Sequence, residues 1–548
     1  MDLSVTGLFK KENGIAFILF FLLSLITVMP ILINPGWPMN HEGNSFFIRT
    51  AIYSSHILSG DIFPIWSSLD NFGFGSPQPA LYHKLFYFIS GELYALLGYG
   101  YIKESIVLAI WFWLFIGAYG TFTLCRETGC CYWLAIGGGI MLLSSNYTTT
   151  NWLIRGAMAE FSGAMLVPWV LASFIKSIKS NRIQLWLPIS FALIFLSHSV
   201  MAYFLAIIFS LALLFLILQQ RLSLKNFRTI SLIQAIICFF LLVGIFLIVL
   251  FLIGQDYNMS RIIPDHYLPE NQIKPLGKYI YDAKWKWGVK WTGYTVALDP
   301  IVLMLLLGGS AFFYFYNSQQ HQFLQGLFNN ISILVLVIIS GLGLFLQTEL
   351  AIPFYRYFPG ANFIQFPWRL LALLTPIFIT LSLSIINMIS SKVGVIFVTC
   401  CAIVMFLFNG AFAPMKYKWF SVDHFSLEAM QLSAFDEYVP VKYRDFSKNS
   451  YNNVIKKMAA EGSTIYTPQP LKETTVRQYL VYCIKPNTVV LPEFSSMGHT
   501  IKIGNAPFQR CNERTDFSSL CAVSLPAGES RVEIHYPTIF STIKSIAK

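Results

Sequence analysis

An acidic residue, Glu42, follows the first long apolar segment of the chain, in the run Met39–Asn44. Its place just beyond a membrane-length segment predicts a carboxylate near the membrane surface, where it can accept a proton from a substrate hydroxyl. His41 precedes it directly and is a candidate binding residue. The alternative for a single glutamate is a solvated loop acid without chemistry. We treat Glu42 as a candidate general base.

A second group of ionisable residues lies in the run Asn151–Glu160. Arg155 and Glu160 stand at the start of a predicted helix near bilayer depth, where charged side chains are costly unless they are paired or face a watery cavity. A structural salt bridge, or an arginine whose head reaches the interface, is the alternative. His198 lies at a predicted outer helix turn, where a histidine satisfied at the interface is the alternative to a cavity residue.

A third group, Gln365, Trp368 and Arg369, precedes another long apolar segment. A guanidinium group on the outer side of the membrane can bind a phosphate diester with two parallel hydrogen bonds, which a lysine cannot do. Anchoring of the helix by an arginine that reaches the interface is the alternative. We therefore expect Arg369 to be a candidate phosphate contact, with Gln365 and Trp368 beside it.

These residues are to be positioned by membrane helices. The 548 residues are 55% hydrophobic and only 12% charged, which excludes a soluble enzyme and a disordered chain. The net charge of +11 is explained by lysines that flank membrane spans, so it does not indicate nucleic-acid binding. Eleven apolar segments are predicted to span the membrane: 14–34, 106–124, 132–147, 156–175, 185–197, 200–218, 230–253, 301–317, 331–347, 370–388 and 393–412.

The distribution of Lys and Arg in the short loops predicts a cytoplasmic N-terminus. An odd number of spans then places the loops 35–105 and 254–300 and the tail on the outer face. We expect residues 80–98 to form an amphipathic helix at the interface. The alternating lysines and tryptophans of Lys284–Trp291 suit an interface belt, and the alternative is a grip on a lipid phosphate or a sugar.

The chain is thus predicted to divide into a transmembrane domain, 1–414, and an outer domain, 415–548. In the outer domain a helical linker precedes short β-rich runs punctuated by turn residues, which predicts a small β-sandwich. Three cysteines lie there, where oxidation is permitted. Our first choice for a disulfide is Cys511 with Cys521, which leaves Cys483 free. No Walker A, dinucleotide or HExxH motif occurs.

Four patches, 39–82, 151–160, 363–371 and 500–534, resemble the GT-C class of membrane glycosyltransferases. More narrowly, they are similar to YfhO-like and "6-pyruvoyl-tetrahydropterin synthase related" bacterial membrane proteins. Those proteins usually carry Asp where this chain has Glu42. The resemblance implies that Glu42 is the base, that Arg155 and Glu160 share its cavity, and that Arg369 contacts the donor phosphate.

On this resemblance we expect transfer of a sugar from a polyprenyl-phosphate donor to a glycan, lipid or protein acceptor, on the outer face of a bacterial inner membrane. Nucleotide sugars are absent outside the cytoplasm, so the donor must be carried by a lipid. No cofactor is required, although Glu42 and Glu160 make a divalent metal an option. The alternatives are a transporter or flippase for a lipid-linked glycan, or a non-catalytic scaffold of the cell envelope.

Overall fold

The computed structural model describes most of the chain. The described residues are 11–42, 45–98, 100–222, 228–255, 257, 265–275, 277–278, 297–316, 329–389, 391–411, 419–422, 438–440, 450–466, 473–496, 498–514 and 517–546.

The chain forms two compact units, each assembled from separate stretches of sequence. The first unit comprises Met1–Gly43, Val107–Val243 and Asp265–Ser421. The second comprises Asn44–Ile106, Gly244–Pro264 and Val422–Lys548. The units do not follow a single boundary at 414, because Asn44–Ile106 groups with the C-terminal residues.

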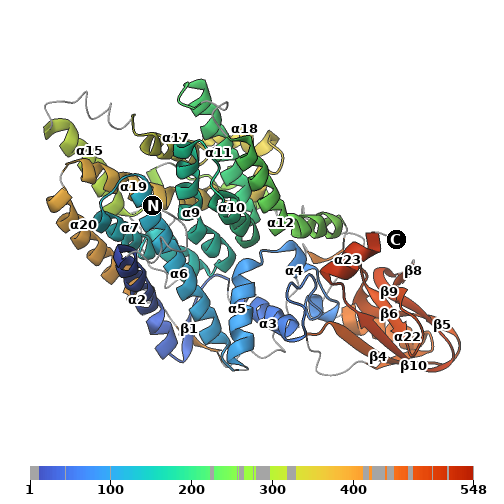
Figure 1. The fold of residues 1–548 in the computed structure, drawn as a ribbon. Helices are drawn as coiled ribbons and strands as arrows, with labels where there is room; N and C mark the ends of the chain where they lie inside the picture. The colour runs from blue at the N-terminus through green and yellow to red at the C-terminus, as the bar shows by residue number, and fades with distance from the viewer. Residues whose placement is uncertain are drawn as a thin grey trace. The chain divides into compact units, whose positions relative to one another are not determined.

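Long apolar helices dominate the first unit, and they are labelled in Figure 1. The helices that satisfy the length and hydropathy of a span are α2 (Lys11–Ile33), α6 (Ile102–Glu127), α9 (Met158–Ser180), α11 (Ser199–Leu218), α12 (Thr229–Gly254), α19 (Leu371–Ile389) and α20 (Ser391–Met405) with the turn that follows it. Seven described helices therefore qualify, or eight if α17 (Ile331–Phe345) and the helical segment Glu349–Tyr357, bent by 83°, form one broken span.

All eleven predicted segments contain a helix, but several of these helices are too short to cross a bilayer alone. They include α7 (Tyr132–Leu143), α10 (Trp186–Ser197) and α15 (Pro300–Tyr316). Hydropathy detects apolar segments, whereas the length of the uninterrupted helix decides whether a segment can span. The eleven-span count is therefore not confirmed.

The predicted interfacial helix at 80–98 is interrupted. Residues Gln78–Leu81 form α4 and Leu85–Leu97 form α5. Between them, Nζ of Lys84 donates to the carbonyls of Pro79, Ala80 and Tyr82 at 2.7–3.1 Å. The lysine satisfies carbonyls that the end of α4 leaves open. Helix α5 packs on α3 (Ser45–Leu58), where Thr50 and Ser90 share a hydrogen bond.

The C-terminal part of the second unit contains two antiparallel sheets, drawn in orange and red in Figure 1. The larger has the order β3-β4-β10-β6-β7, with β3 (Ser463–Tyr466), β4 (Val476–Cys483), β10 (Gly528–His535), β6 (Thr500–Ile503) and β7 (Gln509–Arg510). The smaller has the order β5-β9-β8, with β5 (Asn487–Phe494), β9 (Phe517–Leu525) and β8 (Asn512–Arg514). Helices α22 (Ser450–Ala460) and α23 (Ile539–Ile546) flank the strands in the sequence.

The two sheets agree with the β-rich runs predicted for the tail. Along β4, buried and exposed residues alternate, because successive side chains of a strand point to opposite faces. Cys511 and Cys521 form a disulfide, and Cys483 is a buried free thiol, as predicted.

Candidate functional site

The loop that carries Glu42 is held at both ends within the first unit. Strand β1 (Gly36–Pro38) pairs with β2 (Trp419–Ser421), with Trp37 opposite Phe420. Farther along, the backbone N–H groups of His41 and Glu42 donate to the carbonyls of Ile154 and Arg155, at 3.1 and 3.0 Å. These two carbonyls are available because a single π-helical turn, Thr150–Arg155, ends there. The end of one helix therefore fixes the backbone of the proposed base.

Gly156 makes this contact possible. It adopts a left-handed conformation with φ of 70°, which ends the π-helical turn before α9 begins. A Cβ atom at Gly156 would lie 2.9 Å from Oδ1 of Asn40 and 3.2 Å from Cβ of Glu42. A side chain larger than hydrogen would therefore collide with the loop.

Three of the residues singled out in the sequence form one ionic cluster. The two terminal nitrogens of Arg155 donate to the two oxygens of Glu160 at 2.8 and 3.0 Å, a bidentate pair. Nε of Arg369 lies 3.1 Å from Oε2 of the same carboxylate. Glu160 stands in the first turn of α9, where the helix dipole favours a negative charge. Two guanidinium groups thus face one carboxylate, and the trio carries one excess positive charge.

Neighbouring polar groups hold this cluster in place. The hydroxyl of Tyr147 donates to Oε1 of Glu160, and Oδ1 of Asn151 accepts from Arg155. The guanidinium carbon of Arg155 lies 4.5 Å from the ring centre of Trp368, a cation–π contact. Arg369 also donates to the side-chain oxygen of Gln365 at 3.1 Å. The side chains of Arg155 and Arg369 are 10% and 17% exposed, against 2% for Glu160, so the cluster as a whole is largely buried.

The two histidines lie on different elements. His41 is half-buried, and burial together with the positive charge of Arg155 lowers its pKa, against the opposing effect of Glu42. His198 forms the break between α10 and α11, where its Nδ1 accepts from the backbone N–H of Met201. The Cβ of His198 packs beside Gly163, one turn after Glu160 on α9. The break predicted at Ser197–Ser199 is therefore present, and His198 is buried near the cluster.

A divalent metal does not fit Glu160. Both of its oxygens already face arginines, and two guanidinium groups repel a cation. Among the residues that the structure describes, no three His, Cys, Asp or Glu side chains gather as metal ligands. We therefore derive no step through a metal.

Sequence reasoning did not single out Asn40, Tyr147 and Asn151. Asparagine and tyrosine are common in loops and interfacial helices, so only their contacts with the cluster distinguish them. Nearby along the chain, Tyr355 donates to the carbonyl of Leu346 and Arg356 donates to Glu270. The lysines and tryptophans of 284–291 lie outside the described residues.

Comparison with known proteins gives a distant match. No protein-family model and no curated protein sequence matches this chain. Among solved structures, it is similar to the arabinofuranosyltransferase AftD from Mycobacteria, determined by single-particle cryo-EM. The TM-score is 0.45 at 14% identity, over 84% of this chain and 29% of that chain. At this level the likeness carries no argument about function, and the narrower YfhO-like resemblance is not matched.

Proposed function

We propose that the chain is a membrane glycosyltransferase that moves a sugar from a polyprenyl-phosphate carrier to an acceptor hydroxyl. The observation that carries the proposal is the contact between the Glu42 loop and the Arg155 carbonyl, at 3.0 Å. It joins the backbone of the exposed Glu42 to that of Arg155, whose side chain belongs to a cluster with one excess positive charge. A base beside a cationic phosphate site is what transfer from a phosphate-linked donor requires.

In the proposed reaction, Glu42 takes the proton of the acceptor hydroxyl while the oxygen of that hydroxyl bonds to the anomeric carbon of the sugar. The bond from that carbon to the phosphate oxygen breaks, and the electron pair leaves with the phosphate. Arg155 and Arg369 stabilise the added negative charge on the leaving group, while Glu160 holds both guanidinium groups in position. Attack opposite the phosphate inverts the anomeric centre.

The test is sugar transfer by purified protein in lipid nanodiscs, supplied with a panel of polyprenyl-phosphate sugars and a mixed envelope-glycan acceptor. Glu42→Gln removes the base and should lower the transfer rate by about 10²–10⁴-fold. Glu349→Gln changes another exposed glutamate of the same unit and should transfer at the wild-type rate. Equal transfer by the two variants overturns Glu42 as base. No transfer by wild type with any donor favours a transporter or a scaffold.

A further inference from the structure

Asn40, two residues before Glu42, carries a buried polar atom that no group among the described residues satisfies. The residue is 6% exposed, and among the described residues its Oδ1 has no hydrogen-bond partner. Its Nδ2 lies 3.5 Å from the carbonyl of Pro38, and this contact leaves Oδ1 as the open end of the amide. A buried acceptor without a donor is costly, so its retention needs a reason.

The open acceptor lies beside the proposed site. We consider the point at which a Cβ atom would stand if residue 156 were not glycine. This point lies 2.9 Å from Oδ1 of Asn40 and 3.2 Å from Cβ of Glu42. Because Gly156 has no side chain, the loop that carries Asn40 and Glu42 can pack closely against its backbone. Arg155, one of the two cations of the cluster, is the residue directly before Gly156. The acceptor, the proposed base and the proposed phosphate contact therefore meet around one short segment.

We propose that Asn40 is a sugar-positioning residue, whose Oδ1 accepts a hydrogen bond from a hydroxyl of the sugar that is transferred. This inference rests on the proposed function, because it uses Arg155 as the phosphate contact. The donor sugar is bonded directly to the phosphate, so a phosphate held at Arg155 brings the sugar to the segment whose backbone binds the loop of Asn40 and Glu42. A hydroxyl supplies the donor that Asn40 lacks, and a site built to bind a hydroxyl discriminates strongly against ligands without one.

A second orphan group adjoins the same segment. Asn151 is fully buried, and its Nδ2 has no hydrogen-bond partner among the described residues, although its Oδ1 binds Arg155. Asn151 also accepts, through its backbone carbonyl, the N–H of Ala157 at 3.0 Å. Because Asn151 is fully buried, its unsatisfied donor stays inside the protein, and the proposed contact uses Asn40 alone.

The experiment compares two short-chain lipids, a ten-carbon prenyl phosphoglucose and the corresponding prenyl phosphate without sugar. Their affinities for the full chain in nanodiscs are measured together with the melting temperature. Wild type should bind the lipid that carries the sugar about tenfold more tightly than the bare phosphate. Asn40→Leu keeps the side-chain size and removes the unsatisfied amide. The variant should bind the two lipids within twofold of each other, while its Tm rises by about 2 °C.

Asn34→Leu is the matched control in the same loop. The side chain of Asn34 accepts from the N–H of Gly36 at 2.9 Å, so its loss should lower Tm and leave the tenfold sugar preference intact. A preserved sugar preference in Asn40→Leu, or a lower Tm in that variant, overturns the role of Asn40. So does a wild type that binds both lipids equally, and that result leaves the proposed function standing. Binding of neither lipid by wild type overturns the proposed function and this inference together.

Discussion

Each of the two units buries an arginine–glutamate pair, but the surroundings of the two pairs differ. In the first unit, Glu160 is shared by Arg155 and Arg369, and the cluster keeps an excess positive charge beside the exposed Glu42. In the second unit, Arg477 and Glu493 are 2% and 0% exposed, and the pair is neutral. The same two residue types thus serve two different arrangements.

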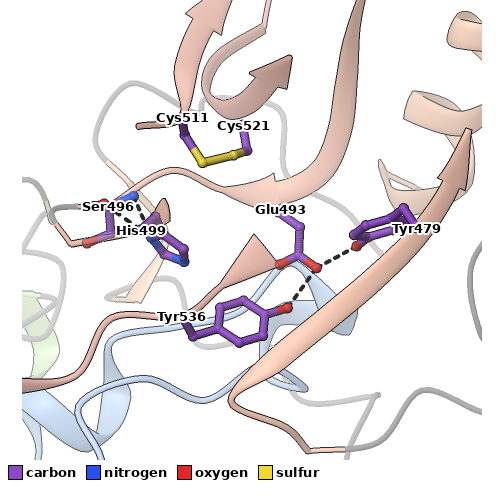
Figure 2. Close-up of a disulfide and its surroundings, with 7 residues drawn as sticks. All are labelled: Tyr479, Glu493, Ser496, His499, Cys511, Cys521 and Tyr536. Carbon is purple, nitrogen blue, oxygen red and sulfur yellow. Dashed lines mark hydrogen bonds between the residues drawn. A yellow bond between two sulfur atoms is a disulfide. The ribbon is translucent and has the colours of Figure 1, made fainter. Parts of the chain in front are cut away.

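The second pair connects the sheets to the first outer loop. Arg477 donates to Oε1 of Glu493 and to the carbonyls of Ser68 and Gly73, the last two at 2.6 Å. Figure 2 shows the hydroxyls of Tyr479 and Tyr536 converging on Glu493, with the Cys511–Cys521 disulfide nearby. The carbonyls of a loop, which must be satisfied once buried, are here satisfied by an arginine from β4.

The difference between the pairs lies in access and in the balance of charge. Oε2 of Glu493 also has no hydrogen-bond partner among the described residues, yet it is sealed in a fully buried, neutral cluster. Asn40 adjoins an exposed carboxylate and a cationic group. A buried polar atom without a partner therefore indicates a ligand only where an exposed carboxylate or a cationic group lies beside it. We interpret the Arg477–Glu493 pair as architectural.

The largest expected effect comes from breaking the architectural pair. Arg477→Met leaves Glu493 as a buried charge without its partner and should lower the free energy of unfolding by about 3–5 kcal/mol. Arg531→Met is the control on β10, because that side chain is 60% exposed and lies 3.7 Å from Glu533. The control should lose under about 0.5 kcal/mol. Denaturant unfolding in detergent measures both, and equal stability of the two variants contradicts an architectural role.

A histidine that connects two segments of the same unit should add a pH dependence that the arginine pairs lack. His56 binds Asp61 at 2.9 Å and Glu473 at 3.0 Å. Burial alone would lower the pKa of His56, but the two carboxylates outweigh it and raise the pKa to about 9, above the ordinary 6.5. The stabilisation is therefore fully present below about pH 6.5 and is lost as the pH rises through about 9.

The expected loss between pH 6.5 and 9.5 is about 1–3 kcal/mol of the free energy of unfolding. His56→Gln should flatten this dependence, and the difference between wild type and variant isolates the contribution of His56. His266→Gln, at an exposed site of the first unit, should leave the dependence unchanged. Parallel stability curves for wild type and His56→Gln between these pH values would show that the two carboxylates do not stabilise the imidazolium.

The smallest expected effect on stability comes from the shared cluster. Arg155→Met leaves Glu160 with Arg369 as partner, so the free energy of unfolding should fall by only about 1–2 kcal/mol. Affinity for the prenyl phosphate should fall about tenfold, because the excess positive charge is gone. Arg356→Met, at a 56% exposed side chain paired with Glu270, is the matched control and should retain that affinity. An Arg155→Met protein with wild-type affinity contradicts the phosphate role.

From the sequence alone, the helical membrane character and the strands of the tail could be predicted, and Cys511–Cys521 was the first choice among the possible disulfides. Each depends on local patterns: runs of apolar residues, alternation with period two, and a short separation between two cysteines. It also singled out Arg155, Glu160 and Arg369, because charged residues are rare at membrane depth. Its count of eleven spans is not confirmed, since hydropathy does not report where a helix stops.

Only the tertiary structure decided which charges meet. Arg155 and Arg369 are 214 positions apart in the numbering, yet they share one carboxylate, which turns two expected phosphate contacts into a cluster with a single excess charge. Asn40 becomes distinctive only because the end of a distant π-helical turn holds its loop against Gly156. The Arg477–Glu493 pair gave no signal in the sequence, because an ion pair depends on distance in space and not on distance along the chain.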